Sequence, residues 1–298
     1  MANSNMPGET VYLNGELVLA TEARVSPFDR AYLLAHAAYE VTAVFNGKLI
    51  DWPAHVSRLI RTLEGIDIPM PMSGDELLAL HEDLMARNGL TEGLIYLQVT
   101  GGAYGARDFA GPKTLTPGLF LFTTAKPLIT ELARDGIHAI SAPDTRWTQR
   151  DMKTTQLLSQ ALAYRTARDD GADTAWLHED GIVTEAASAN TWIVTKGGTL
   201  VTRDLSPALL PGITRESVQR LMAEEGFKIE ERAFTLDDVH EAAEAFTTST
   251  GVVIAPVLSL DGEQIGTGKP GPVTRAVQRH YYEYFGADVA KLAPWALS

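Results

Sequence analysis

The sequence predicts an α+β fold made of two domains, and two observations support this prediction. Clusters of short strands are separated by single amphipathic helices, whereas a doubly wound parallel sheet would alternate strand and helix throughout. The chain has 298 residues, 45% of them hydrophobic, which is enough for two domains of ordinary size. The boundary is expected near residues 126–130, so that a small domain covers 1–127 and a larger one covers 128–298.

The first domain is predicted to begin with a β-hairpin. Apolar residues alternate around Asn14-Gly15, and Asn-Gly is favoured in tight two-residue turns. A strand and a second such turn, Asn46-Gly47, follow. Two segments with apolar residues at helical spacing and two apolar strands complete the domain, over 52–68, 74–89, 93–102 and 118–125. Residues 126–136 are expected to form a connection.

The second domain is predicted to mix short strands with three helices. A strand over 137–143 is followed by an amphipathic helix expected to hold Lys153. The remaining elements are several short strands over 174–204, a helix over 214–226, strands over 243–266 and a last helix over 272–286.

Composition excludes several classes of function. The formal net charge of -13 makes the chain a poor general binder of nucleic acid or anionic membrane. The absence of cysteine excludes disulfides, thiolate catalysis and thiolate metal sites. The seven histidines are dispersed, so no metal site is expected. Without a signal peptide or an apolar run of roughly 20 residues, the protein is expected to be cytoplasmic.

A glycine motif near the C-terminus is interpreted as a simple loop. Gly266, Gly268 and Gly271 form G-x-G-x-x-G before a helix. A dinucleotide-binding motif opens a βαβ unit, but here Pro270 interrupts the motif and no further strand is predicted after the helix.

Lys153 is the first residue that suggests chemistry. Apolar residues follow it at helical spacing: Leu157, Leu158, Ala161, Leu162 and Tyr164. A lysine beside an apolar surface has its charged form disfavoured, and a neutral amine can condense with an aldehyde. Taken alone, a surface lysine near the start of a helix is the commoner interpretation.

Glu185 is the second such residue. It lies between an apolar strand and a run of small residues, and a buried carboxylate needs a partner. The protonated nitrogen of a pyridine ring is one possible partner, and a nearby arginine is the other.

Three further features suggest an anion-binding site. The Pro-Gly turn before Ile213 and Thr214 opens a helix, where backbone N–H groups attract anions. Ser249 and Thr250 offer hydroxyl groups, and Arg58 offers a charged contact. Each of these residues alone is ordinary for a cap, a strand or a surface.

Five segments, taken in order, resemble the motifs of the fold type IV pyridoxal-phosphate enzymes: HVSRL, DMKTTQLLSQALA, GIVTEAASANTWIV, LLPGITRESV and TTSTGVVIAPV. That family includes D-amino acid, branched-chain and (R)-selective amine transaminases and aminodeoxychorismate lyase. The resemblance runs from about Val11 to Gly286. Five ordered motifs with matching separations outweigh the commoner interpretation of each residue alone.

The resemblance implies a small N-terminal α/β domain and a larger pseudobarrel domain, with pyridoxal 5′-phosphate as cofactor and a homodimer as the active unit. Lys153 would form the Schiff base and move a proton, Glu185 would pair with the pyridine nitrogen, and Leu210 would pack against the ring. The residues implied for the phosphate are Arg58, Ile213, Thr214, Ser249 and Thr250. Those assigned to substrate binding are Tyr39, Tyr96 and Arg107.

Within the family, the chain looks most like the D-amino acid transaminases. That implies transfer of an amino group between a D-amino acid, such as D-alanine, and a 2-oxo acid. The subgroup continues its QVT strand with an arginine and then an Arg-x-His pair that grips the α-carboxylate. Here Gly101 replaces the first arginine, Arg107 is shifted by one residue, and Asp108 stands where histidine is expected.

This departure leaves other activities open. One alternative is a transaminase for (R)-primary amines, alone or together with D-amino acids. Another is an aminodeoxychorismate lyase, which would release pyruvate without an amino acceptor. A non-catalytic acidic binding protein that only retains the fold is the remaining alternative.

Overall fold

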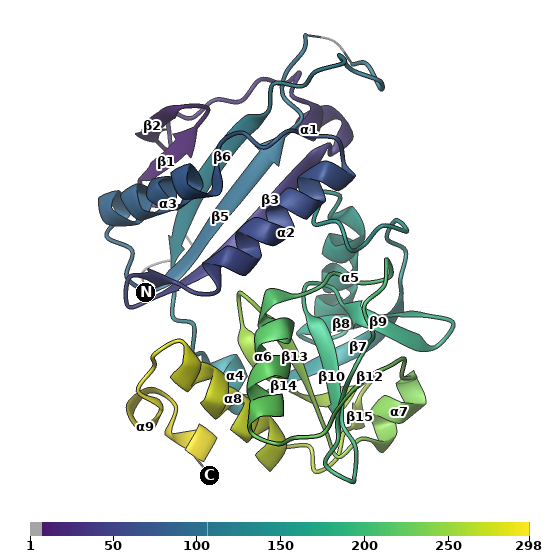
Figure 1. The fold of residues 1–298 in the computed structure, drawn as a ribbon. Helices are drawn as coiled ribbons and strands as arrows, with labels where there is room; N and C mark the ends of the chain where they lie inside the picture. Colours follow the sequence, from purple (N-terminus) through teal and green to yellow (C-terminus); the bar gives the residue numbers. More distant parts are fainter. Residues whose placement is uncertain (1–7, 106, 298) are drawn as a thin grey trace. The chain divides into compact units, whose positions relative to one another are not determined.

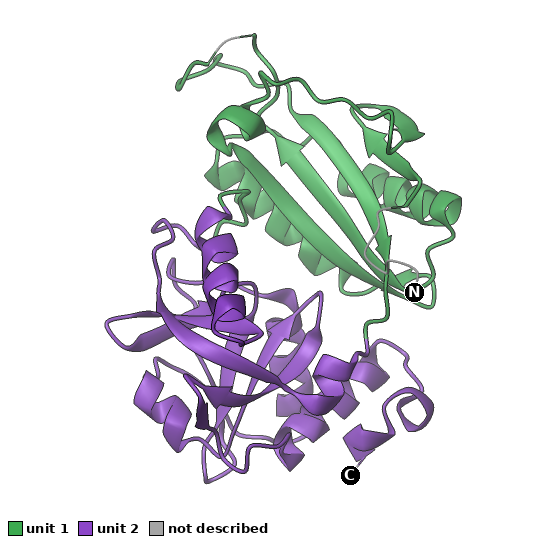
Figure 2. Cartoon of the chain, turned by 180° about the vertical axis from the view of Figure 1, so that it is seen from behind, with its two compact units in different colours: residues 1–128, 152–156 green, residues 129–151, 157–298 purple. Residues whose placement is uncertain are grey.

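The computed structural model describes residues 8–105 and 107–297, and the chain divides into two compact units. Unit 1 comprises Met1–Leu128 and a short return segment, Met152–Gln156, whereas unit 2 comprises Ile129–Asp151 and Leu157–Ser298 (Figure 2). The chain therefore passes from one unit to the other three times.

Unit 1 is built on a six-stranded sheet in the order β2-β1-β6-β5-β3-β4, and each neighbouring pair is antiparallel (Figure 1). The strands are β1 (Thr10–Leu13), β2 (Glu16–Leu19), β3 (Ala37–Phe45), β4 (Lys48–Leu49), β5 (Gly93–Thr100) and β6 (Gly118–Ala125). The helices are α1 (Arg30–Leu34), α2 (Trp52–Gly65) and α3 (Gly74–Asn88). The predicted first hairpin is present, with positive φ at Asn14 and Gly15 as a two-residue turn requires.

The core of unit 1 lies between its sheet and the helices α2 and α3. Leu59 and Leu63 of α2 and Leu77 of α3 pack against the central strands, for example at Leu97. Because side chains alternate across a strand, β3 turns Ala38 and its even-numbered neighbours toward this helical layer. The odd-numbered residues of β3 therefore face the other side of the sheet.

Unit 2 is built on a nine-stranded sheet whose main order is β12-β11-β10-β13-β14-β7-β8-β9, with β15 beside β14. Its strands are β7 (Ile137–Pro143), β8 (Thr174–Glu179), β9 (Ile182–Ala186), β10 (Asn190–Val194), β11 (Leu200–Thr202), β12 (Ile229–Glu231), β13 (Glu244–Ser249), β14 (Val253–Leu260) and β15 (Glu263–Gln264). Its helical elements are α4 (Glu131–Asp135), α5 (Leu158–Asp169), α6 (Ile213–Glu224), α7 (Leu236–Glu241), α8 (Pro272–Tyr284), α9 (Val289–Leu292) and the 3₁₀ helix η1 (Pro294–Leu297). Parallel and antiparallel pairs coexist in this sheet, as in other α+β folds.

The prediction of a helix holding Lys153 was wrong. Helix α5 begins only at Leu158, and Lys153 lies before it in the return segment of unit 1. The helix does not bury the apolar stripe either: Leu158 is 73% exposed and Leu162 is 52% exposed. Its buried face is formed by small residues, of which Ala167 packs against strand β8. The apolar spacing was real, but it marks an exposed surface and not an anchor for the lysine.

Candidate functional site

Lys153 is fixed by backbone contacts to the edge of β3. Its carbonyl oxygen accepts a hydrogen bond from Tyr39 N at 3.0 Å, and Thr155 N donates to the Ala37 oxygen at the same distance. Thr154 and Ala38 form an isolated antiparallel bridge. The return segment thus behaves as a short extra strand, which explains why these few residues belong to unit 1.

The amine of Lys153 lies over an aromatic surface. Its Nζ atom is 4.1 Å from the centre of the Tyr39 ring, within the range of a cation–π contact. Tyr39 stacks on Tyr96 at 5.6 Å between ring centres, and Tyr96 stacks on Phe122 at 5.0 Å. Burial raises the pKa of Tyr96, so its hydroxyl stays protonated and donates to Gln98. The structure therefore brings Lys153, Tyr39 and Tyr96 together.

Arg107, the third residue assigned to substrate binding, is not part of this group. It is exposed, and its guanidinium lies 4.4 Å from the ring centre of Phe109. The loop around it is held instead by the buried Arg30, which donates to the carbonyl oxygens of Asp108 at 2.7 Å and Phe109 at 3.0 Å. Nothing in the local sequence around Arg30 indicates this role.

Arg58 forms a buried ion pair that its local sequence does not reveal. It lies on α2, and its Nε and Nη2 atoms are 2.7 Å and 2.8 Å from the two carboxylate oxygens of Glu40. His55 Nδ1 lies 2.8 Å from the same carboxylate. Glu40 is the residue after Tyr39, so alternation along β3 turns it to the helical face. One turn further along α2, Thr62 accepts a hydrogen bond from Lys153 N at 3.3 Å, so the return segment contacts the same helix that carries Arg58.

The electrostatics of this group favour a permanently charged pair. Burial alone would raise the pKa of Glu40, but the charge and hydrogen bonds of Arg58, followed by those of His55, outweigh it. The pKa of Glu40 is therefore held well below its ordinary value. Glu40 stays ionised and fixes the plane of the arginine, as bidentate pairs do.

Glu185, in unit 2, is a buried carboxylate with three donors around it. The side chain lies on β9, and the residue is only 4% exposed. One oxygen, Oε1, contacts Nη1 of Arg146, and the other, Oε2, accepts from Asn190 Nδ2 and from Leu210 N, each at 3.2 Å. Burial raises the pKa of Glu185, and Arg146 opposes that effect. One of the two expected partners, an arginine, is therefore present. Because a carboxylate offers about four acceptor positions and three donors contact this one, a position remains for the other, the protonated nitrogen of a pyridine ring.

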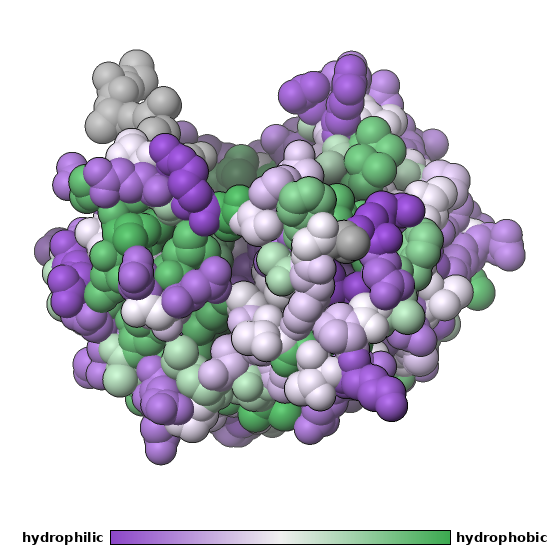
Figure 3. All heavy atoms as spheres, turned by 90° about the horizontal axis from the view of Figure 1, so that it is seen from above, coloured by the Kyte–Doolittle hydropathy of each residue, from purple (hydrophilic) through white to green (hydrophobic). Residues whose placement is uncertain are grey.

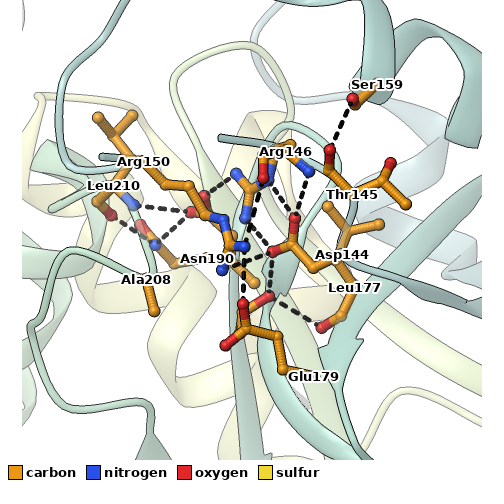
Figure 4. A network of polar contacts seen from close by, with 12 residues as sticks. Asp144, Thr145, Arg146, Arg150, Ser159, Leu177, Glu179, Asn190, Ala208 and Leu210 are labelled. Atoms are coloured by element: carbon orange, nitrogen blue, oxygen red, sulfur yellow. Dashed lines mark hydrogen bonds and ion pairs between the residues drawn. The ribbon is translucent and has the colours of Figure 1, made fainter. Parts of the chain in front are cut away.

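Arg146 belongs to a wider network of polar contacts (Figure 4). Its Nε and Nη2 atoms lie 2.9 Å and 2.7 Å from the two oxygens of Asp144. Asp144 is also contacted by Thr184 Oγ1 at 2.7 Å and by Arg150 at 3.4 Å. Arg146 and Glu185 are 39 positions apart in the sequence, so no local spacing reveals their contact.

The start of helix α6 has the features of an anion site. Its N-cap residue, Gly212, provides no side-chain cap, and Ile213 and Thr214 in its first turn are buried. A Cβ atom at Gly212 would lie 1.9 Å from Asn190 Oδ1, so the turn requires glycine. The first-turn N–H groups are therefore available to an external anion.

The predicted pair of hydroxyl residues, Ser249 and Thr250, lies at the end of β13. Ser249 is its last residue, and the Ser249 Oγ accepts a hydrogen bond from Val252 N at 3.2 Å. Thr250 follows in the turn that leads to β14.

Helix α8, which follows the G-x-G-x-x-G motif, differs from α6 because a side chain of the protein already provides an anion at its start. Glu244 accepts hydrogen bonds from Val273 N and Thr274 N. This agrees with the interpretation of that motif as a loop.

The donor set fits pyridoxal phosphate. The group carries an anionic phosphate, a ring nitrogen that takes a proton, and an aldehyde. Unit 1 offers an amine and a buried arginine, and unit 2 offers a buried carboxylate and uncapped helix amides. In the part of the chain that the structure describes, no three acidic or histidine side chains are arranged to hold a metal ion. No helix within those residues is long and apolar enough to cross a membrane.

Comparison with known proteins identifies the family. Residues 37–260 match the model of the class IV aminotransferases. The D-alanine aminotransferase of Bacillus licheniformis is 35% identical over 281 residues, covering 94% of this chain and 99% of that protein. The D-alanine aminotransferase of Staphylococcus aureus strain N315 is 33% identical over 277 residues, covering 93% and 98%.

Solved structures agree with this assignment. The branched-chain amino acid aminotransferase of Escherichia coli has a TM-score of 0.85 and 26% identity, covering 96% of this chain and 98% of that one. The pyridoxal-phosphate form of the branched-chain enzyme of Thermobaculum terrenum has a TM-score of 0.80 and 25% identity, covering 97% of each chain. The chain therefore belongs to the class IV aminotransferases and is a pyridoxal-phosphate-dependent transferase of fold type IV.

Proposed function

We propose that this enzyme transfers the amino group between a D-amino acid, such as D-alanine, and a 2-oxo acid. The observation that carries the proposal is the similarity to D-alanine aminotransferases along nearly the whole chain. The branched-chain enzymes resemble the chain in fold at lower identity, so they support the scaffold and the cofactor more than the substrate.

In this proposal Lys153 is the residue that bonds to the cofactor and moves the proton. Pyridoxal phosphate supplies an aldehyde that takes up the amino group and a ring that withdraws electrons from the reacting carbon. The backbone pairing of Lys153 with β3 fixes the position from which its amine acts, and the Tyr39 ring lies beside that amine. Proton transfer by a positioned group of this kind contributes roughly 10²–10⁴-fold to the rate.

The remaining residues hold the cofactor. Glu185 keeps a proton on the ring nitrogen, and Leu210 supports the ring while its backbone N–H binds Glu185. The phosphate is bound by a larger set made of one arginine, two first-turn residues and two hydroxyl residues: Arg58, Ile213, Thr214, Ser249 and Thr250. The uncapped start of α6 supports this assignment.

A second candidate function is the transfer of amino groups from (R)-primary amines. The loop after β5 favours it, because Arg107 is exposed against Phe109 and the neighbouring Asp108 would repel an α-carboxylate. An enzyme without a firm grip on that carboxylate would accept donors that lack it. Tyr39 and Tyr96 provide an aromatic surface that suits such donors.

The donor is identified by half-reactions of the yellow holoenzyme with D-alanine, L-leucine and (R)-1-phenylethylamine, followed by absorbance. We expect D-alanine to convert the cofactor fastest. A faster reaction with L-leucine or the amine would overturn the D-amino acid proposal. Pyruvate formed from aminodeoxychorismate without any acceptor would identify the lyase instead, and protein that binds no pyridoxal phosphate would exclude all three activities.

Replacement of Arg107 tests whether it binds the substrate carboxylate. For Arg107→Ala we expect a rise in KM for D-alanine and little change in KM for (R)-1-phenylethylamine, because only D-alanine carries a carboxylate. The same panel of donors measures both. The matched control is Arg87→Ala, which removes another exposed arginine, on α3. Equal losses with the two donors would remove Arg107 from carboxylate binding.

We also propose that the enzyme acts in the cytoplasm as a homodimer. Leu158 and Leu162 lie one helical turn apart on α5 and are largely exposed, so a partner surface would cover them favourably. Figure 3, which shows one face of the molecule, likewise has hydrophobic residues exposed among hydrophilic ones. Light scattering of the holoenzyme measures the oligomeric state directly.

A further inference from the structure

The buried carboxylate of Glu185 has its partners outside its own strand, β9. The residue is 4% exposed, and a buried carboxylate is costly unless it is paired and hydrogen-bonded. Its two neutral donors, Asn190 and Leu210, both contact the same oxygen at 3.2 Å. The positive charge that faces Glu185 is that of Arg146, which contacts the other oxygen.

The side chain of Arg146 is held in one orientation by burial and by Asp144. Its side chain is 6% exposed, and Asp144 beside it is 0% exposed. Two of its nitrogens, Nε and Nη2, are held by the two oxygens of Asp144 at 2.9 Å and 2.7 Å. Because the guanidinium is planar, this bidentate contact fixes the direction of the third nitrogen, Nη1, which meets Glu185.

Asp144 is in turn tied to the strand that carries Glu185. Thr184, the residue before Glu185 on β9, donates to Asp144 Oδ2 at 2.7 Å. Arg150 lies 3.4 Å from the same oxygen and is itself paired with Glu179 at 2.7 Å (Figure 4). The buried centre thus contains two carboxylates and two guanidinium groups, and the loss of Arg146 would leave two negative charges close together with one cation.

We propose that Arg146, oriented by Asp144, is a positioning residue that holds Glu185 as an ionised carboxylate in a fixed orientation, and so keeps the proton on the cofactor's ring nitrogen. This inference rests on the proposed role of Glu185 toward that nitrogen. Without Arg146, burial and the charge of Asp144 both favour uptake of a proton by Glu185. A neutral Glu185 has no charge with which to stabilise a protonated ring.

The test measures protonation of the ring nitrogen by ¹⁵N NMR, in holoenzyme reconstituted with ¹⁵N-labelled pyridoxal phosphate. In wild type we expect the signal of a protonated nitrogen, and in Glu185→Gln that of an unprotonated one. Arg146→Gln should resemble Glu185→Gln, and the double variant should show no further change. Turnover of Arg146→Gln should fall roughly 10- to 100-fold, the loss typical when an orienting partner is removed from behind a functional ligand.

Conservative and control variants separate positioning from a general loss of structure. Arg146→Lys keeps the charge but not the bidentate contact with Asp144, so we expect partial protonation of the ring nitrogen. Asp144→Asn should have a similar partial effect, which keeps the test available if Arg146→Gln does not fold. Arg275→Gln removes a half-buried arginine on α8 that bonds the Ala133 carbonyl, and it should keep the wild-type signal.

Three outcomes would contradict the inference, and each is distinguishable from the others. If Glu185→Gln leaves the ring nitrogen protonated, the proposed role of Glu185 fails, and with it this inference. If Glu185→Gln changes the signal but folded Arg146→Gln and Arg146→Lys both retain the wild-type signal, only the role of Arg146 is overturned. A signal change in Arg275→Gln as large as in Arg146→Gln would likewise reduce Arg146 to a structural residue.

Discussion

Lys153→Ala is expected to abolish amino transfer, whereas the folded variant should still bind pyridoxal phosphate. The residues assigned to the phosphate and the ring nitrogen are unchanged in this variant, so noncovalent binding persists. The loss of proton transfer alone costs roughly 10²–10⁴-fold, and the loss of the covalent link adds to it. Half-reaction rates with D-alanine measure the effect, and equilibrium dialysis measures cofactor binding.

The control for this variant is Lys196→Ala, which removes an exposed lysine after strand β10 and should leave the rate unchanged. Borohydride reduction of the wild-type holoenzyme, followed by peptide mapping, should modify Lys153. A pyridoxyl group found on another lysine, or substantial transfer by Lys153→Ala, would contradict the central assignment.

Glu40→Gln should destabilise the protein by about 3–5 kcal/mol, the usual cost of breaking a buried ion pair from one side. The variant leaves Arg58 and His55 around a neutral amide in a buried place. Urea unfolding of the apoprotein measures the change in the free energy of unfolding. Glu64→Gln, at an exposed position on the same helix as Arg58, is the matched control and should cost little.

The contribution of Glu40 should also depend on pH in a defined direction. Its pKa is lowered by folding, from an ordinary value near 4.5, so the unfolded chain binds the proton first as pH falls. The stability difference between wild type and Glu40→Gln should therefore be constant near neutral pH and should narrow below about pH 4.5. A difference that stayed constant down to pH 3, or one that grew on acidification, would show that Glu40 is not held ionised by its partners.

The secondary structure was predictable where local chemistry decides it. The Asn14-Gly15 hairpin and the amphipathic helix around Arg58 follow from turn preference and apolar spacing, and both are present. The position of Lys153 was not predictable in this way. Its segment precedes a helical pattern, but its conformation is set by pairing with the edge of β3, more than one hundred residues earlier in the chain.

The candidate site was recognisable by its motifs but not by its supporting contacts. Glu185 stood out as a carboxylate between an apolar strand and a run of small residues, whereas nothing in the sequence around Arg146 indicates its contact with Glu185. Their pairing joins residues 39 positions apart, and only the sheet of unit 2 brings them together. Glu40 was overlooked for a related reason, because the sequence beside Tyr39 does not show that its partners lie on α2.

The three crossings between the units have a consequence for dividing this protein into parts. A fragment of residues 1–128 would contain Tyr39 and Arg58 but no Lys153, and a fragment of 129–298 would carry Lys153 without the strand edge that fixes it. The two units are therefore not interchangeable modules. Recombination with a relative at a single junction between β3 and Lys153 would pair the lysine segment of one protein with the β3 edge of another. Exchange between such enzymes is therefore expected to succeed only when both stretches come from the same protein.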